Sequence, residues 1–137
     1  METGISDINT LLKSMTPELS DAEYVFTTIS YKENLPDVTF AIGMFKEREG
    51  TTFIFPKDYL PSSISSKFVV GNFRMISLNV HSSLQAVGLT AAISKSLADK
   101  NISANIIAGF YHDHIFVPTD RASEAMEILK CLQERSS

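Results

Sequence analysis

The sequence predicts an α+β fold built of two similar halves, each with an antiparallel sheet. Hydrophobic residues make up 44% of the chain and charged residues 20%, a balance that supports a folded core rather than disorder. Alternating apolar and polar residues indicate strands, and apolar residues three or four positions apart indicate helices. The same succession of these patterns occurs twice along the 137 residues, which indicates two halves of one design.

The first half is expected to hold a short helix and three strands. The helix covers residues 8–19 and ends near Pro17, because the residue before a proline avoids α geometry. Aromatic and β-branched residues mark the strands, over residues 24–29, 39–45 and 51–55. A loop over residues 31–37 joins the first two strands, and the turn Glu47–Gly50 favours a hairpin with a positive φ near its end.

The second half has clearer patterns. A strand over residues 73–80 is apolar on one face, and a helix follows over residues 82–100. Ser82 is the expected N-cap, with Gln85 completing a capping box, and Asn101 suits the left-handed position after the helix. The remaining elements are two strands and a helix, over residues 104–110, 114–117 and from Thr119 or Asp120 onward.

Two similar segments indicate an internal duplication. Residues 41–45 lead through a hairpin to a strand that ends before Pro56, and residues 107–111 lead through a shorter hairpin to a strand that ends before Pro118. A strand precedes each copy. In the second half a helix joins that strand to the hairpin, whereas in the first half only the loop over residues 31–37 is available. Shared hairpin physics is the alternative explanation for this likeness.

The order strand, helix, strand, strand, helix, strand defines the ferredoxin-like fold. The first half is therefore expected to lack its first helix. No closing strand fits after the last helix, so the first half or a second subunit must cover the open sheet edge of the second half. Residues 67–70 are expected to close the first sheet and residues 73–80 to open the second, which places the halves at residues 1–71 and 72–137.

Charge and cysteine content disfavour several classes of protein. The chain has 12 Lys and Arg against 16 Asp and Glu, a net charge of −4, and no basic run, which disfavours a nucleic-acid partner. Cys131 is the only cysteine, so neither an intrachain disulfide nor a cysteine-rich zinc site is possible. No signal-peptide pattern and no apolar run of about 20 residues is present. We therefore expect a soluble cytoplasmic protein with no cofactor and no membrane partner.

Two runs in the second half resemble a known family. Residues 76–92 read ISLNVHSSLQAVGLTAA, and residues 105–118 read NIIAGFYHDHIFVP. Together with LLxxMxPxL at residues 11–19, and with looser matches at residues 24–26 and 49–51, they resemble an uncharacterised bacterial family of tandem ACT-like proteins. The chain is also similar to the ACT halves of larger amino-acid sensors. The resemblance implies two ACT-type βαββαβ halves that bind a small metabolite, typically an amino acid, and pair side by side.

The resemblance also implies a ligand site. In ACT domains the effector typically lies at the turn between the first strand and the first helix, which here is the turn at residues 81–84, with Gly88 expected one turn into the helix. A helix N-terminus offers free N–H groups to a carboxylate, and Asn105 on the next strand can bond an amine or amide. The residues implied for ligand binding are His81, Ser82, Ser83, Leu84, Val87, Gly88, Asn105 and Ile106.

Purely structural roles are open to the same residues. An N-cap is a sufficient role for Ser82, close packing of helix and strand is sufficient for Gly88, and a local turn is sufficient for Asn105, without any ligand. Fold analogy by itself is a weak warrant for a binding site.

A metal site is a second alternative. His112 and His114 are two residues apart, so on a strand they point the same way, and His81 could be a third ligand. Their place at a hairpin tip, where solvated Asp and His are common, weighs against this. A catalytic pairing of His81 with Ser82 or Ser83 lacks an orienting acid, which disfavours an enzyme.

The sequence thus predicts a regulatory or sensing module that binds a small metabolite without catalysis. A structural or protein-interaction module with no ligand is the first alternative, and a metal-binding protein is the second. Aromatic residues on both faces of the strands also predict a homodimer, namely Phe40, Phe45, Phe53, Phe55, Phe73, Phe110 and Phe116.

Overall fold

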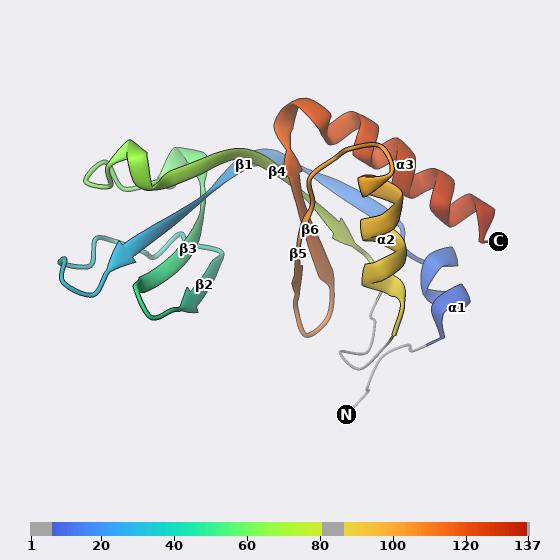
Figure 1. Ribbon diagram of the computed structural model, residues 1–137, viewed down its shortest axis with the longest axis horizontal. Coiled ribbons are helices and arrows are strands. Elements are labelled where there is room, and N and C mark those ends of the chain that lie inside the picture. The colour runs from blue at the N-terminus through green and yellow to red at the C-terminus, as the bar shows by residue number, and fades with distance from the viewer. Residues whose placement is uncertain (1–6, 81–86, 137) are drawn as a thin grey trace. The chain divides into compact units, whose positions relative to one another are not determined.

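The computed structural model describes residues 7–80 and 87–136 (Figure 1). The chain divides into two compact units. The first comprises Met1–Asp21 and Arg74–Ser137 and is called the helical unit; the second comprises Ala22–Phe73 and is called the helix-poor unit. Two long strands, β1 (Pro17–Ser30) and β4 (Val69–Leu78), contribute residues to both units.

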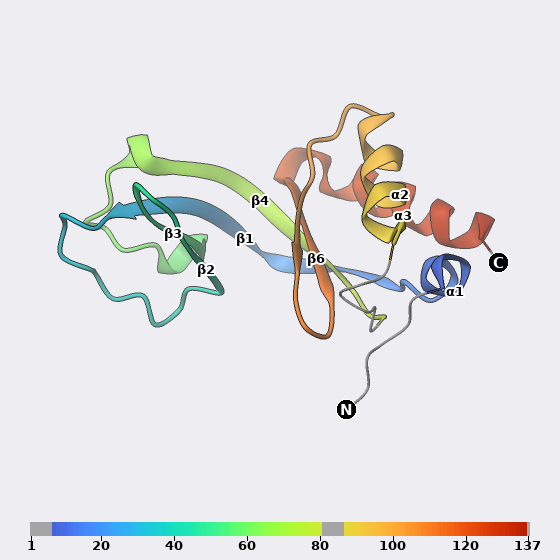
Figure 2. The ribbon, with the colours of Figure 1, turned by 60° about the horizontal axis from the view of Figure 1, so that its bottom comes forward.

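The helical unit combines parts of β1 and β4 with a hairpin and helices. Its other described elements are α1 (Ile8–Lys13), α2 (Leu89–Ala98), β5 (Asn105–Ala108), β6 (Asp113–Pro118), the 3-10 turn η3 (Thr119–Arg121) and α3 (Ala122–Arg135). The strands hydrogen-bond in the order β1-β4-β6-β5, and β5 runs antiparallel to β6. Both views of the ribbon show α2 and α3 on the same side of the β5–β6 hairpin (Figure 1 and Figure 2).

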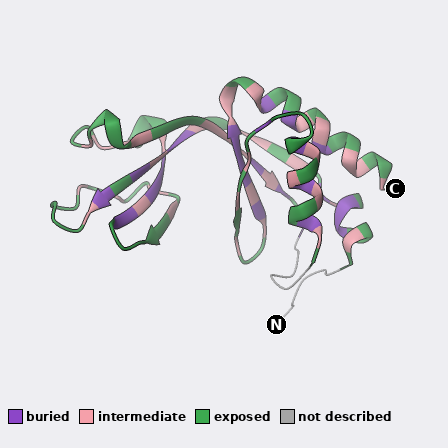
Figure 3. Ribbon diagram, viewed as in Figure 1, coloured by how far each residue is buried: buried purple, intermediate pink, exposed green. Residues whose placement is uncertain are grey.

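Helical periodicity places the main core between these helices and the sheet. The stripe that α2 buries is spaced four residues apart, at Leu89, Ile93 and Leu97. Alternate residues of β4 and β6 face the same core, at Ile76, Leu78, Ile115 and Val117 (Figure 3). Two buried residues of α1, Leu11 and Leu12, join this cluster. No described helix is long and apolar enough to cross a membrane.

The N-terminal part of β1 closes the sheet of the helical unit. The backbone N–H of Met75 donates to the Ser20 hydroxyl over 3.0 Å, and the Arg74 Nε–H donates to the Ser20 carbonyl over 2.9 Å. The backbone N–H of Asn79 donates to the Met15 carbonyl over 2.8 Å. The bonded residues move toward the start of β1 as they move toward the end of β4, so the two segments are antiparallel. The first half of the sequence therefore covers the edge that the last helix leaves open, one of the two solutions expected.

The helix-poor unit has a smaller core. It contains β2 (Gly43–Lys46), β3 (Gly50–Pro56) and the 3-10 turns η1 (Lys57–Tyr59) and η2 (Ser66–Phe68), with the strand order β2-β3-β1-β4. Its buried cluster consists of Val25, Ile29, Phe53 and Phe55. The residues that pack on this cluster come mostly from loops, at Val38, Ala41, Leu60 and Ile64, together with Val69 at the start of β4. This unit has no α-helix.

Both units have the ferredoxin-like arrangement, in which the first strand lies between the third and the fourth and the second lies at the edge. In the helical unit β4, β5 and β6 are the first three strands, and β1 supplies the fourth. In the helix-poor unit β1, β2 and β3 come first, and β4 supplies the fourth. The predicted α+β class and the missing first helix are thus confirmed. The boundary between residues 71 and 72 stays a prediction about the duplicated segments.

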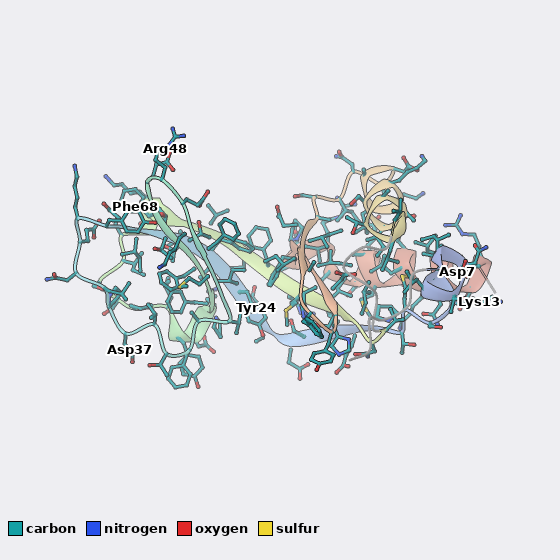
Figure 4. The ribbon with its side chains drawn as sticks, turned by 90° about the horizontal axis from the view of Figure 1, so that it is seen from below. Asp7, Lys13, Tyr24, Asp37, Arg48 and Phe68 are labelled. Carbon is teal, nitrogen blue, oxygen red and sulfur yellow. The ribbon has the colours of Figure 1, made fainter. Side chains whose placement is uncertain are left out.

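The first helix is shorter than the sequence predicted. Asp7 caps α1, because its carboxylate accepts hydrogen bonds from the Thr10 N–H over 3.0 Å and the Thr10 hydroxyl over 2.7 Å (Figure 4). These bonds lower the pKa of the exposed Asp7 carboxyl. The helix ends at Lys13, Thr16 takes a φ of 41°, and Pro17 begins β1. The expectation that Pro17 ends this helix was wrong: the helix ends before it, and the proline begins a strand.

Two glycine and cap expectations also needed correction. Gly50 does not take a positive φ; its missing side chain instead allows β3 to approach β1. Neither Thr119 nor Asp120 caps the last helix: both lie in η3, and α3 begins without a side-chain cap bond. Asn101 does adopt the left-handed conformation, with a φ of 59°.

The two glycines of the β2–β3 hairpin give a matched test of this packing. A Cβ at Gly50 would lie 2.9 Å from the carbonyl carbon of Ile29 and 3.0 Å from the Cα of Ser30, and backbone atoms cannot yield. We expect Gly50→Ala to lower the free energy of unfolding by about 1–3 kcal/mol, measured by urea denaturation.

Gly43→Ala is the control for Gly50→Ala. Its new Cβ would meet only the flexible end of the Ile54 side chain, at 3.0 Å. The loss of unfolding free energy should therefore stay below about 1 kcal/mol. Equal losses in the two variants would show that the close approach of β1 and β3 is not what selects glycine at position 50.

Candidate functional site

The predicted ligand-binding turn leads into α2. Residues 81–86 lie outside the described residues, so His81, Ser82, Ser83 and Leu84, and the expected Ser82–Gln85 capping box, are not placed. Val87 and Gly88 are placed, and neither is helical. Because α2 begins at Leu89, Gly88 stands at its N-cap, and the expectation that Gly88 lies one turn inside the helix was wrong.

The backbone conformation at position 88 favours glycine. Its φ is +105° and its ψ is −24°, a region that L side chains rarely adopt. A Cβ at this position would lie 3.5 Å from Cδ1 of Ile8, an ordinary contact, so space alone does not demand glycine. Among the residues that the structure describes, no side chain caps α2, and Ala92 N–H donates the first helical bond, to the Gly88 carbonyl over 2.9 Å. The N–H groups of the first turn therefore have no acceptor within the helix.

The two predicted residues of β5 lie on opposite faces of the sheet. Asn105 pairs with Phe116 and is exposed, whereas Ile106 pairs with Ile115 and packs against the core of the helical unit. Successive side chains of a strand alternate between faces. A ligand on one face of β5 can thus contact Asn105 or Ile106 through its side chain, but not both.

The two histidines of the alternative metal-site hypothesis lie at the β5–β6 hairpin. The Gly109 N–H donates to the His112 carbonyl over 2.9 Å, which makes the hairpin tight. The His112 and His114 rings are 6.5 Å apart between centroids. His114 Nδ1 shares a hydrogen bond of 2.8 Å with the Ser77 hydroxyl, while His112 Nδ1 is buried without a hydrogen-bond partner. Within the described residues no three metal-ligating side chains come together.

The environment of His114 favours its neutral form. Burial lowers the pKa of the imidazole, and the neighbouring His112 lowers it further. Asp113 acts in the opposite direction and raises the pKa, without cancelling the other two effects. A neutral imidazole is the form that binds a metal ion, but here it already engages Ser77.

Two adjoining hollows open at the end of β1 in the helix-poor unit, with volumes of about 170 and 140 Å³. Thr28, Glu33 and Phe68 line both hollows (Figure 4 labels Phe68). The larger one adds polar groups from Asn34, Ser63 and Ser65. These hollows follow the first strand of their unit, as residues 81–88 follow the first strand of the helical unit. Sequence analysis missed them, because the loop carries no motif.

A wider groove of about 510 Å³ runs between α2 and α3. Its walls carry charges of both signs, including Lys100, Glu127 and Arg135, and the exposed thiol of Cys131. It lies at the C-terminal end of α2 rather than at the predicted turn. Its open, charged walls resemble a solvated helix surface more than the apolar pockets that usually hold small ligands.

Comparison with known proteins agrees with this architecture. Two models of the ACT domain match the chain, at residues 3–62 and 70–131. A Vibrio cholerae protein, VC0802, described as of unknown function and as a possible transport protein, is 40% identical. The match covers 91% of this chain and 94% of that one, with a TM-score of 0.77. The class defined by the fold and by these matches is thus that of ACT domains. The chain belongs to the ACT-domain family and carries two such domains in tandem.

More distant structures share the fold alone. The regulatory subunit of aspartate kinase from Thermus flavus is 10% identical, with a TM-score of 0.63 over 87% of this chain and 98% of that one. The Agrobacterium tumefaciens protein Atu0741 is 14% identical, with a TM-score of 0.66 over 82% of this chain and 84% of that one. A search of curated proteins gave no match.

The lowered pKa of His114 predicts acid sensitivity. The unfolded chain takes up a proton near the ordinary value of 6.5, whereas folded His114 does so only at lower pH. The free energy of unfolding should therefore fall as the pH drops below 6.5 toward the folded pKa. Urea denaturation over a pH series measures this.

His114→Gln should remove this part of the pH dependence. His112→Gln is the matched control and should retain most of it, because burial of His114 is the larger cause of the pKa shift. An unchanged pH profile in His114→Gln would assign the acid sensitivity to other groups. The carboxyls of Asp7 and Asp37, whose pKa values are lowered from 3.8, titrate below this window.

Proposed function

We propose that this protein is a regulatory module that binds a small metabolite, foremost an amino acid, and performs no catalysis. Its membership of the ACT-domain family supports this, because ACT domains are typically ligand-binding regulatory modules. A regulatory subunit of aspartate kinase has a similar fold over most of its length. The module passes its response to a separate partner protein in the cytoplasm, with no nucleic acid, membrane or cofactor involved.

The start of α2 after Gly88, where no described side chain forms a cap bond, is the observation that supports the proposed site. Unpaired N–H groups and the partial positive charge at a helix N-terminus together favour a carboxylate. Gly88 has no side chain to block that approach, and Val87 is 84% exposed. The exposed Asn105 is the proposed partner of the ligand's amine. The proposed set remains His81, Ser82, Ser83, Leu84, Val87, Gly88, Asn105 and Ile106, of which Ile106 can take part only through its backbone, because its side chain packs against the core.

A homodimer is part of the same proposal. Large apolar side chains are exposed in the helix-poor unit, among them Phe45, Met44 and Leu35. Exposed apolar patches on a small domain commonly mark interfaces. The same surface favours the second candidate function, an interaction module that binds no ligand. Ligand screening separates the two.

A thermal-shift screen tests the proposed function. The probes are the individual amino acids, nucleotides and divalent metal ions. A ligand that binds only the folded state at about 100 times its Kd adds about 2.7 kcal/mol, which raises Tm by a few degrees. We expect one amino acid to give a selective shift. A shift with zinc or nickel alone would support a metal site at His112 and His114, and no shift with any probe would support the interaction module.

Two asparagine variants then locate the ligand. Asn105→Ala should weaken binding several-fold while leaving the Tm of the free protein unchanged, since Asn105 is exposed. Asn34→Ala, in the hollow of the helix-poor unit, is the matched control and should bind normally. The reverse result would place the ligand in that hollow. Gly88→Ala is less informative, because its positive φ makes any side chain destabilising.

A further inference from the structure

The tip of the β5–β6 hairpin brings two imidazole rings close together. A Cβ at Gly109 would lie 2.8 Å from the His112 carbonyl oxygen, so glycine allows the tight turn that the Gly109 N–H closes by donating to this oxygen. The same Cβ would lie 3.5 Å from Nε2 of His114, so the absence of a side chain at position 109 also leaves space beside that nitrogen. The His112 and His114 rings lie 6.5 Å apart between centroids, with 77° between their planes.

One ring nitrogen of this pair is buried without a hydrogen bond. In the described part of the chain, Nδ1 of His112 is the only buried side-chain nitrogen or oxygen that has no partner. Buried polar atoms are nearly always paired, so an unpaired one indicates a water, an ion or a ligand that the chain does not itself provide. A ligand that accepts the lone pair of this nitrogen would remove the cost of burying it unpaired.

The second imidazole is oriented by a residue of β4. Nδ1 of His114 shares a hydrogen bond of 2.8 Å with the Ser77 hydroxyl, which leaves Nε2 as the nitrogen available to a ligand. Histidines that bind metal ions usually have their other ring nitrogen hydrogen-bonded, because that bond fixes the ring and selects its tautomer. Burial and the neighbouring His112 lower the pKa of His114, so its ring stays neutral at a lower pH than an exposed histidine does.

We propose that His112 and His114 bind one divalent transition-metal ion, through Nδ1 of His112 and Nε2 of His114. Two nitrogens bound to one ion at about 2.1 Å lie about 3–4 Å apart, and rings with centroids 6.5 Å apart can bring their nitrogens to about 4 Å. A small side-chain rotation closes the difference. Asp113 faces the opposite side of β6, and no third metal-ligating side chain joins the pair within the described residues. Water therefore fills the remaining positions around the ion.

Imidazole ligands determine the class of ion. Neutral imidazole suits Cu²⁺, Ni²⁺ and Zn²⁺, whereas Mg²⁺ and Ca²⁺ prefer oxygen ligands. For one set of ligands the affinity rises from Mn²⁺ to Cu²⁺ and falls again at Zn²⁺, so Cu²⁺ is expected to bind most tightly. The ion would join the hairpin tip to β6, beside the strand β4 that leads into the turn proposed for the metabolite. Metal binding at the hairpin does not require the metabolite site.

Isothermal titration calorimetry of the full chain, without a histidine tag and freed of metal by dialysis against EDTA, tests the proposal. The probes are Cu²⁺, Ni²⁺, Zn²⁺, Mn²⁺ and Mg²⁺ at neutral pH. We expect one Cu²⁺ per chain, weaker binding of Ni²⁺ and Zn²⁺, still weaker binding of Mn²⁺, and no binding of Mg²⁺. Lowering the pH below about 6.5 should weaken binding, because protons compete for the imidazole nitrogens.

Single substitutions then locate the ion. His112→Gln and His114→Gln should each weaken binding by about tenfold or more, and Ser77→Ala by about tenfold, because it removes the bond that orients His114. Cys131→Ser is the matched control: its thiol is exposed and binds the same ions, but it lies on α3 outside the hairpin, so this variant should bind as the wild type does. Circular dichroism and Tm verify that each variant is folded.

Electron paramagnetic resonance of bound Cu²⁺ gives an independent measurement, made in the Cys131→Ser background because a free thiol reduces Cu²⁺. The spectrum should show coupling to two imidazole nitrogens, and to only one in either histidine variant. Unchanged affinity and spectrum in both histidine variants would assign the ion to adventitious ligands and overturn the site. Absence of binding by Cu²⁺, Ni²⁺ and Zn²⁺ would overturn it equally. Thermal shifts with amino acids in the presence of EDTA report on the metabolite site separately.

Discussion

Pairing of β1 with β4 is the interaction on which both sheets depend. In the helical unit the segment of β1 before Ala22 closes the sheet that the last part of β4 opens. In the helix-poor unit the roles are exchanged: β1 opens the sheet and the first part of β4 closes it. Neither ferredoxin-like sheet can be completed from one contiguous half of the sequence. The two halves are thus linked through backbone hydrogen bonds, and their folding is expected to be interdependent.

The two units bury apolar cores of different size. The helical unit buries a large apolar cluster between α2, α3 and its sheet, which supplies most of the hydrophobic stabilisation. The core cluster of the helix-poor unit is smaller, with Val25, Ile29, Phe53 and Phe55, and mostly loop residues pack on it. Because a loop replaces the first helix in the helix-poor unit, less apolar surface is buried there and more apolar side chains are exposed to solvent. The larger share of the apolar core therefore lies in the helical unit.

The proposed ligand site depends on backbone geometry more than on side chains. Gly88 takes a positive φ directly before α2, and no described side chain forms a cap bond at the first turn of this helix. A site of this kind needs few specific residue types. Because backbone groups would make most of the contacts, the ligand chemistry of such a site is difficult to predict from residue identity.

Sequence by itself determined the fold class, the succession of elements, and much of the core. Apolar spacing of three or four residues identified α2 and α3, alternation identified β4, and the repeated hairpin indicated the duplication. These signals are local, because each depends on which face of one element is buried. The local rules for caps and turns failed at Gly50, Gly88 and Thr119, where the chain meets other segments.

Only the tertiary structure decided which strand completes the sheet of the helical unit. The start of β1 at Pro17 looked like the end of a helix, and nothing near it indicates β4 as its partner, more than 50 residues away. The same holds for the pairing of Ser77 with His114 and for the exposure of β2. Strand partners and solvent exposure are set by segments distant in sequence, so the free energy that selects them is not encoded in any local pattern.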